Sequence, residues 1–210
     1  MTDNIASHMD SIDGVYLDYG GVVAHSVKFR DWAVLDYCER CGIDRGAALA
    51  EIQADRAAGD IGDIGLADSY RRIAAKFGIA VPAEEFARRA TALDCEGWVN
   101  IAPETLSLIS EFKAAGKKVG VLSNQSREFF EGYFCVAGAG IRAMLDAEVI
   151  SAVEHLRKPD PAIYALASRR IGIAPGRLLF LDDLEPNVEA ARSCGWRAER
   201  YVLDSDAALR

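Results

Sequence analysis

Three segments of the chain share one pattern, in which a continuous apolar run ends at small or acidic polar residues. They are GVYLD (14–18), KVGVLSN (118–124) and RLLFLDD (177–183). Continuous apolar runs of this length are typical of strands that are covered on both faces, as in a parallel sheet. Two shorter segments, AEVIS (147–151) and AERYV (198–202), are the remaining candidate strands.

Helical patterns lie between these runs, and each has a start, an apolar face and a stop. One begins at Pro103 and closes at Gly116, another begins at Pro161 and closes at Gly172, and a third extends from residue 186 to residue 195. The alternation of strand and helix predicts βαβ units. We therefore expect an α/β fold with a doubly wound, Rossmann-like parallel sheet.

The alternation is interrupted between residues 28 and 100, where helical patterns occur with no strand pattern. Two apolar faces recur at helical spacing there: Phe29, Trp32, Ala33 and Tyr37, and then Leu66, Tyr70, Ile73, Ala74 and Phe77, which close at Gly78. The glycine-rich GDIGDIG (59–65) is interpreted as a turn between two helices. We expect a helical cap domain at 28–100, a core made of 11–27 and 101–210, and a disordered segment at 1–10.

The net charge of −8 and the pI of about 5.0 restrict the partners. No basic patch is evident, which argues against nucleic acid or an anionic membrane as the main partner. No apolar run approaches the length of about 20 residues that crosses a bilayer. The polar N-terminus lacks the apolar centre of a signal peptide, and the five scattered cysteines suit reduced thiols, so a cytoplasmic location is expected.

The polar ends of the three long apolar runs are predicted to meet at one edge of the sheet. In open α/β sheets, ligands bind at the carboxyl ends of the strands, where the strand order reverses. Asp18, the pair Ser123 and Asn124, and the pair Asp182 and Asp183 would therefore face one crevice. Three acids close together repel one another unless a cation lies among them. A ligand set made only of oxygen indicates a hard ion, and Mg²⁺ is the expected cofactor.

A lysine at the same edge would complete a site for a phosphate group. Lys117 and Lys118 precede their strand and would lie at the opposite edge of the sheet. Lys158, in RKPDP, directly precedes a predicted helix and would lie at the carboxyl edge, beside a helix N-terminus that favours anions. Lys158 is therefore the predicted cation of the site.

These groups together can transfer a phosphoryl group. A carboxylate nucleophile can form an aspartyl-phosphate, while a metal ion and a lysine stabilise the charge on the transferring oxygens. The predicted helical insertion directly follows the strand of Asp18 and could exclude water as a lid. The sequence thus favours an enzyme that acts on a small phosphorylated metabolite, and it leaves the oligomeric state open.

The order of these motifs resembles the haloacid dehalogenase-like superfamily. The motifs are DYGGVV (18–23), LSN (122–124), KPDP (158–161) and FLDD (180–183), and the resemblance spans about residues 12 to 203. The inserted helical region is similar to the helical cap of one large subgroup. KPDPAIYALA and FLDDLEPNVEAARSCGW resemble the phosphatases of that subgroup.

The resemblance implies a role for each site residue. Asp18 matches the catalytic nucleophile, and Lys158 matches the balancing cation. Ser123 and the amide of Asn124 match the phosphate-binding groups. The metal ligands would be the carboxylates of Asp18 and Asp183, the backbone carbonyl of Gly20, and Asp182 either directly or through water.

Gly20 departs from the pattern of most phosphatases in the superfamily. They carry an aspartate two residues after the nucleophile, which acts as general acid and base. The backbone oxygen remains at Gly20 but the proton donor is lost, and such a loss typically costs on the order of 10²–10⁴-fold in rate. The form D-x-G-G-V also resembles a subset that includes glucose-1-phosphate phosphatases, whose anomeric leaving group is easier to expel.

Several alternatives stay open on the sequence. A 2-haloacid dehalogenase also lacks the second aspartate, but it needs no metal, and FLDD would repel a carboxylate substrate. A receiver domain carries its acidic pair early in the chain and has no helical insertion. A weakly active or inactive relative would only bind a phosphorylated ligand.

His25 is a candidate substitute proton donor, and Trp98 and Arg127 are candidate substrate contacts. Cys38 and Cys41 form a C-x-x-C motif, and both cysteines are expected to be packing residues.

Overall fold

The computed structural model describes residues 3–25 and 32–203 and confirms the α/β fold. Its sheet has five parallel strands in the order β3-β2-β1-β4-β5, so β1 lies at the centre. All five predicted strands form, with ends within two residues of the predicted runs. The strands are β1 (Gly14–Leu17), β2 (Lys118–Ser123), β3 (Ala147–Ile150), β4 (Leu178–Asp182) and β5 (Arg197–Arg200).

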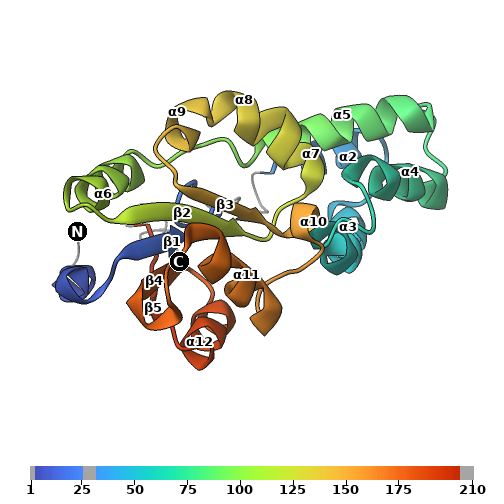
Figure 1. The fold of residues 1–210 in the computed structure, drawn as a ribbon. Helices are drawn as coiled ribbons and strands as arrows, with labels where there is room; N and C mark the ends of the chain where they lie inside the picture. The colour runs from blue at the N-terminus through green and yellow to red at the C-terminus, as the bar shows by residue number, and fades with distance from the viewer. Residues whose placement is uncertain (1–2, 26–31, 204–210) are drawn as a thin grey trace.

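Helices cover both faces of this sheet (Figure 1). On one face lie α6 (Pro103–Ala114), α7 (Arg127–Phe129), the π-helical η3 (Phe130–Phe134), α8 (Cys135–Ala137) and α9 (Ala139–Arg142). On the other face lie α11 (Pro161–Ile171) and α12 (Glu185–Ser193). Two short elements connect strands to helices: α10 (Ser151–Glu154) and the 3₁₀ turn η4 (Pro175–Arg177).

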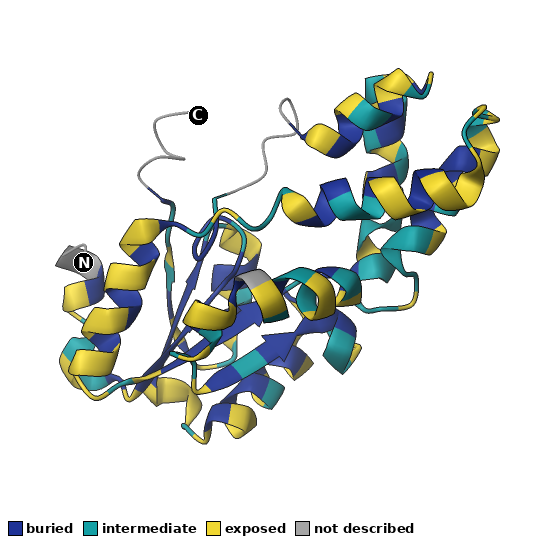
Figure 2. Ribbon diagram, turned by 90° about the horizontal axis from the view of Figure 1, so that it is seen from above, coloured by how far each residue is buried: buried dark blue, intermediate teal, exposed yellow. Residues whose placement is uncertain are grey.

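Burial on both faces explains the continuous apolar runs of β1, β2 and β4, whereas the edge strand β5 begins and ends at exposed arginines. In β1, Val15 and Leu17 pack in the cluster that includes Ile109 and Phe112 of α6. Tyr16 points to the opposite face and packs in the cluster that includes Tyr164 of α11. Figure 2 shows the central part of the sheet buried, between helices whose outer faces are exposed.

Between residues 32 and 100, where the helical insertion is expected, the structure describes four helices. They are α2 (Ala33–Arg40), α3 (Arg45–Asp60), α4 (Leu66–Phe77) and α5 (Ala83–Glu96). They bury an apolar cluster of their own, which includes Trp32, Tyr70 and Phe86. Gly78, with φ of 60°, ends α4 as the sequence predicts. Phe29 and the predicted boundary between residues 27 and 28 lie outside the described residues.

The insertion packs beyond the carboxyl ends of the strands (Figure 1) and contacts the core through the turn after α3. The backbone N–H of Leu66 donates to Glu128 Oε1 at 2.8 Å, and the ring Nδ1 of His155 hydrogen-bonds with the carbonyl of Ile61 at 2.9 Å. Residues 61–65 of GDIGDIG therefore form a turn between two helices, as predicted, while Gly59 and Asp60 end α3. This turn and the first residue of α4 contact the core.

The N-terminal segment, expected to be disordered over residues 1–10, is instead folded at residues 3–10, while residues 1 and 2 lie outside the described residues. It forms α1 (Asp3–Ala6) and the 3₁₀ turn η1 (Met9–Ser11). Ile5 is 2% exposed and joins the core cluster, while His8 Nε2 lies 3.0 Å from Glu199 Oε1. Ile5 and Met9 pack against the core and anchor this segment, which its polar composition did not reveal. No helix in the described residues has the length and apolar character needed to cross a membrane.

Candidate active site

Asp18 lies at the carboxyl end of the central strand, beside the point where the strand order reverses. Its backbone N–H donates to the carbonyl of Leu181, and the N–H of Tyr19 donates to Asp18 Oδ1 at 2.6 Å. A tight turn follows, in which Gly21 has φ of 80° and donates to the carbonyl of Ala24 at 2.7 Å. The second glycine of DYGG therefore supplies the left-handed conformation, and the turn holds Asp18 at the edge of the sheet.

Lys158 joins Asp18 to Asp182. Its ammonium lies 2.8 Å from Asp18 Oδ1 and 2.6 Å from Asp182 Oδ2, and its side chain is 1% exposed. Asp18 Oδ2 makes no hydrogen bond within residues 3–25 and 32–203. One carboxylate oxygen of Asp18 is thus held in place while the other is available for chemistry.

Asn124 holds the loop that carries Lys158. Its side-chain Nδ2 donates to the carbonyl of Lys158 at 2.9 Å, and its Oδ1 accepts from the N–H of Lys158 at 2.8 Å. Both functional groups of this side chain are therefore engaged with the lysine backbone. Asn124 and Ser123 both line the cavity in front of Asp18, as the sequence predicts. The structure adds a positioning contact that the sequence did not indicate.

Three carboxylates can hold a metal ion. Asp18, Asp182 and Asp183 each offer an oxygen within 4.8 Å of the others. Asp182 is 0% exposed and also accepts from the N–H of Leu184 at 2.8 Å and from Asn187 Nδ2 at 3.0 and 3.1 Å. An all-oxygen donor set of three acids beside one ammonium suits a hard cation such as Mg²⁺. Because Asp182 already accepts several hydrogen bonds, Asp18 and Asp183 are the more accessible ligands.

Burial and charge set the ionisation of this cluster. Burial raises the pKa of Asp18 to about 7, Lys158 opposes that shift, and Asp182 adds to it. Burial favours the neutral form of Lys158, but Asp18 and Asp182 outweigh it and raise the pKa of Lys158 above its ordinary value. Lys158 therefore stays charged, and a second cation would favour the ionised form of Asp18.

A cavity of about 470 Å³ opens in front of Asp18. Its volume falls in the range that holds a small metabolite. Among its lining residues, six were not predicted from the sequence: two lie in the cap, one directly precedes Lys158, and three follow the ends of β2 and β4. These are Arg56, Asp60, Gln125, Arg157, Leu184 and Asn187. In the sequence, Asp60 is marked only by its position near the start of the glycine-rich segment. The polar face of the preceding helix does not show which of its side chains turn toward the core.

Trp98, which sequence reasoning considered as a substrate contact, also lines the cavity. The candidate proton donor His25 and the other candidate contact, Arg127, lie elsewhere. His25 and Arg127 do not line this cavity, and Arg127 is bonded to Glu131 and to the carbonyl of Ala152. Cys38 is buried in the apolar cluster of the cap, as expected for packing.

The match to known proteins covers most of the chain. Residues 12–195 match the family described as haloacid dehalogenase-like hydrolase. The chain belongs to the haloacid dehalogenase-like hydrolases. Residues of all four sequence motifs, namely Asp18, Ser123, Lys158 and Asp183, line the cavity at this edge of the sheet.

Two curated relatives of this hydrolase differ in their chemistry. "Phosphatase MT3486" of Mycobacterium tuberculosis is 30% identical over 118 residues, which cover 56% of this chain and 53% of the relative. "(S)-2-haloacid dehalogenase 2" of a Pseudomonas species is 30% identical over 106 residues, which cover 49% of this chain and 45% of the relative. The chain spans about half the length of these curated relatives.

Two solved structures share the fold. A haloacid dehalogenase family enzyme of Bacteroides thetaiotaomicron, in complex with magnesium and inorganic phosphate, has a TM-score of 0.75 at 19% identity and covers 95% of this chain and 100% of its own. An L-2-haloacid dehalogenase of Xanthobacter autotrophicus, with chloropropionic acid covalently bound, has a TM-score of 0.63 at 20% identity and covers 95% of this chain and 81% of its own.

Proposed function

We propose that this hydrolase is a Mg²⁺-dependent phosphatase that acts on a small phosphorylated metabolite through an aspartyl-phosphate at Asp18. The observation that carries the proposal is the placement of one ammonium, Lys158, among the carboxylates of Asp18, Asp182 and Asp183. The acids outnumber this cation, so a phosphate dianion would be repelled without a further positive charge. A divalent cation at the acidic cluster balances that charge.

The residues of the site account for both steps of the reaction. Asp18 attacks the phosphorus atom, the bond from phosphorus to the ester oxygen breaks, and that oxygen leaves with the electron pair and takes a proton from solvent. Water then attacks phosphorus and gives one proton to solvent, the bond to Asp18 breaks, and inorganic phosphate leaves while the carboxylate is regenerated. Lys158 stabilises the charge on the transferring oxygens, and Ser123 lies in the cavity wall where it can hydrogen-bond to them. Bound Mg²⁺ supplies further positive charge against the same oxygens.

The glycine at position 20 limits which leaving groups this site can expel. Since the position offers no side-chain proton donor, an alkoxide that needs protonation would leave slowly. Sugar 1-phosphates, whose anomeric oxygen is a better leaving group, are therefore the proposed substrate type. This preference agrees with the resemblance of D-Y-G-G-V to glucose-1-phosphate phosphatases.

A turnover assay tests the proposed function. We expect Mg²⁺-dependent hydrolysis of 4-nitrophenyl phosphate, lost on chelation and reduced by at least about 10³-fold in Asp18→Asn. Glucose 1-phosphate should be hydrolysed faster than glucose 6-phosphate, and equal rates on both would remove the leaving-group argument. Absence of turnover in the wild-type protein would indicate an inactive, ligand-binding relative.

A 2-haloacid dehalogenase is the second candidate, because Gly20 is compatible with it. In such an enzyme Asp18 would attack carbon and displace a halide. The cluster of Asp18, Asp182 and Asp183 argues against it, since these acids would repel the carboxylate of the substrate. Halide release from 2-chloropropionate without added metal would support the dehalogenase and overturn the phosphatase.

A further inference from the structure

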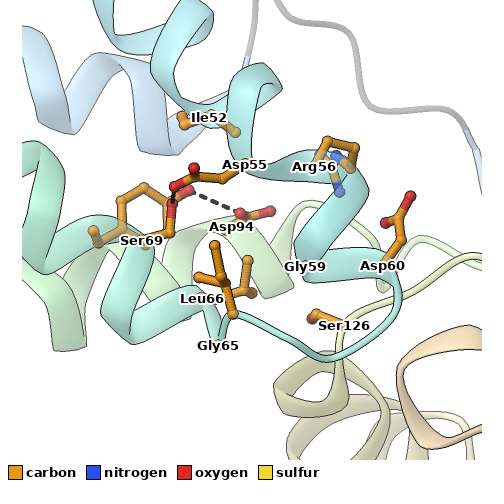
Figure 3. Close-up of a pocket in the computed structure, with 12 residues that line it drawn as sticks. Ile52, Asp55, Arg56, Gly59, Asp60, Gly65, Leu66, Ser69, Asp94 and Ser126 are labelled. Carbon is orange, nitrogen blue, oxygen red and sulfur yellow. Dashed lines mark hydrogen bonds between the residues drawn. The ribbon is translucent and has the colours of Figure 1, made fainter. Parts of the chain in front are cut away.

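Two arginines from different parts of the fold face the cavity in front of Asp18. Arg56 comes from α3 of the cap, and Arg157 comes from the core loop directly before Lys158. Figure 3 shows Arg56 and Asp60 on the same side of α3, away from Asp55. The cap therefore places a guanidinium at the cavity that also contains the catalytic groups.

Both arginines have donors that the protein itself does not use. Arg56 is half-buried, yet it forms no hydrogen bond or ion pair with the part of the chain that the structure describes. Arg157 Nη2 lies 3.2 Å from Asp60 Oδ2, but its Nε is buried and has no hydrogen-bond partner there. A buried donor without a partner costs free energy, and a native structure that keeps one requires an explanation. A ligand that accepts hydrogen bonds from both arginines would satisfy these donors and explain why they are kept.

Asp60 holds Arg157 but does not neutralise both arginines. Its side chain is 5% exposed and contacts Arg157, and both arginines favour its ionised form against burial. One carboxylate balances only one of two guanidinium groups, so positive charge remains on this side of the cavity. That local charge is notable in a chain whose net charge is −8. A divalent cation and Lys158 together carry three positive charges, which balance the three carboxylates of the acidic cluster. The two arginines are then in excess over the single carboxylate of Asp60.

We propose that Arg56 and Arg157 form a subsite for a second anionic group, a carboxylate or a phosphate, carried by the leaving group of the substrate. Guanidinium groups bind such anions through paired, charge-assisted hydrogen bonds. Asp60 is a positioning residue that holds Arg157. The inference rests on the proposed phosphatase function and narrows its substrates to phosphate esters with a second negative charge.

Matched aryl phosphates test the subsite. The probes are 2-, 3- and 4-carboxyphenyl phosphate, each paired with the isosteric and neutral carbamoylphenyl phosphate, and the corresponding phosphonophenyl phosphates. The three ring positions scan the distance between the two anionic groups. We expect kcat/KM for at least one carboxylate or phosphonate ester to exceed that of its neutral partner by about tenfold or more, mostly through KM. The preferred group then distinguishes a carboxylate from a phosphate.

Variants connect that preference to the arginines. Arg56→Gln and Arg157→Gln should each reduce the ratio of anionic to neutral kcat/KM to within about threefold of unity. Arg88→Gln, on the exposed face of α5, is the matched control and should keep the ratio. In the Asp18→Asn background, calorimetry should show the same preference in binding, and Arg56→Gln should remove it. This second measurement does not depend on turnover.

The outcomes separate the subsite from the proposed function. No Mg²⁺-dependent turnover of any probe would overturn the phosphatase itself. Turnover without a preference for any anionic probe would overturn the subsite and leave the phosphatase intact. A preference that survives in both Arg56→Gln and Arg157→Gln would also overturn the subsite, because the anion would then be held elsewhere.

Discussion

A β-carbon built on Gly20 would lie 2.9 Å from Cζ3 of Trp98, closer than carbon atoms of real side chains approach. Trp98 follows α5, where the chain returns from the cap to the core. Its ring therefore occupies the space that a side chain at position 20 would need. Most phosphatases of this superfamily carry a general acid at this position. Here the residue is glycine, and the Trp98 ring leaves no room for a larger side chain.

Gly20→Asp should therefore destabilise the protein without adding an effective acid. Overpacking costs about 1–3 kcal/mol, and the displaced Trp98 ring would disturb the cavity wall. Thermal unfolding should show a lower Tm, and the rate on glucose 6-phosphate should not increase. Trp98→Ala opens the space, so Gly20→Asp made in that background should be less destabilising. It should raise kcat/KM on glucose 6-phosphate by about tenfold or more relative to Trp98→Ala alone. A stable and more active Gly20→Asp single variant would contradict this account.

Lys158→Met should destabilise the protein and remove activity. The substitution leaves Asp18 and Asp182 buried without a counter-charge, which costs about 3–5 kcal/mol when one partner of a buried pair is lost. Lys158 lowers the pKa of Asp18, so its removal raises that pKa further. The loss of stability should accordingly shrink as the pH falls and the carboxyl groups take up protons. Urea unfolding at pH 8 and pH 5 measures this difference.

Lys76→Met is the matched control for the Lys158 variant. Lys76 pairs with Glu51 at 2.6 Å, but its side chain is 58% exposed. Exposed pairs contribute roughly 0–1 kcal/mol, so this variant should stay close to wild type at both pH values. Equal effects of the two substitutions would show that burial of Lys158 does not set the stability of the site.

The core and the acidic cluster could be predicted because their pattern is local. The strands β1, β2 and β4 bury side chains on both faces, so the apolar run itself marks each strand and its end. In a parallel sheet those ends share one edge, which brings Asp18, Asp182 and Asp183 together. Lys158 followed from its place before a helix at the same edge. No knowledge of distant packing was needed for these residues.

The cap side of the site could not be predicted in the same way. Arg56 belongs to the polar face of α3. The sequence of a polar helix face does not show which of its charged side chains point to solvent and which point to another domain. Its direction depends on how the cap contacts the core, through pairs such as Leu66 and Glu128 that are far apart in sequence. Asn187 was missed for a related reason: it lies within α12 and reaches back to Asp182.

Magnesium binding should release protons and strengthen as the pH rises toward neutrality. In the metal-free protein, burial raises the pKa of Asp18 to about 7, so at pH 6 this group is mostly protonated. A metal ligand must be deprotonated, and the apparent affinity should fall by about tenfold for each pH unit below 7. Above pH 8 the dependence should level off.

Calorimetry at pH 6, 7 and 8, in two buffers of different ionisation enthalpy, measures both affinity and proton release. We expect the release to approach one proton at pH 6 and to vanish near pH 8. Asp18→Asn removes the titrating group and should flatten the proton release, although its affinity for Mg²⁺ should also be lower. A wild-type affinity that does not change between pH 6 and pH 8 would exclude Asp18 as a titrating ligand.

Gly62→Ala should move the cap away from the core. Gly62 has φ of 77°, and a β-carbon there would lie 2.6 Å from the carbonyl oxygen of Ala152. A left-handed conformation costs a residue with a β-carbon about 1–2 kcal/mol, and the contact with Ala152 adds displacement of the turn that follows α3. Because Arg56 and Asp60 lie at the end of α3, the cavity should widen and KM should rise several-fold.

Gly78→Ala is the control variant, which introduces backbone strain without displacing the cap. Gly78 also has a positive φ, of 60°, but nothing lies within 4 Å of a β-carbon built there. The substitution should lower the Tm through strain at the end of α4 while leaving KM near the wild-type value. Small-angle scattering should show a larger radius of gyration for Gly62→Ala and an unchanged radius for Gly78→Ala. If both variants raised KM equally, strain within the cap would explain the effect, and the contact between Gly62 and Ala152 would have no role in closing the cavity.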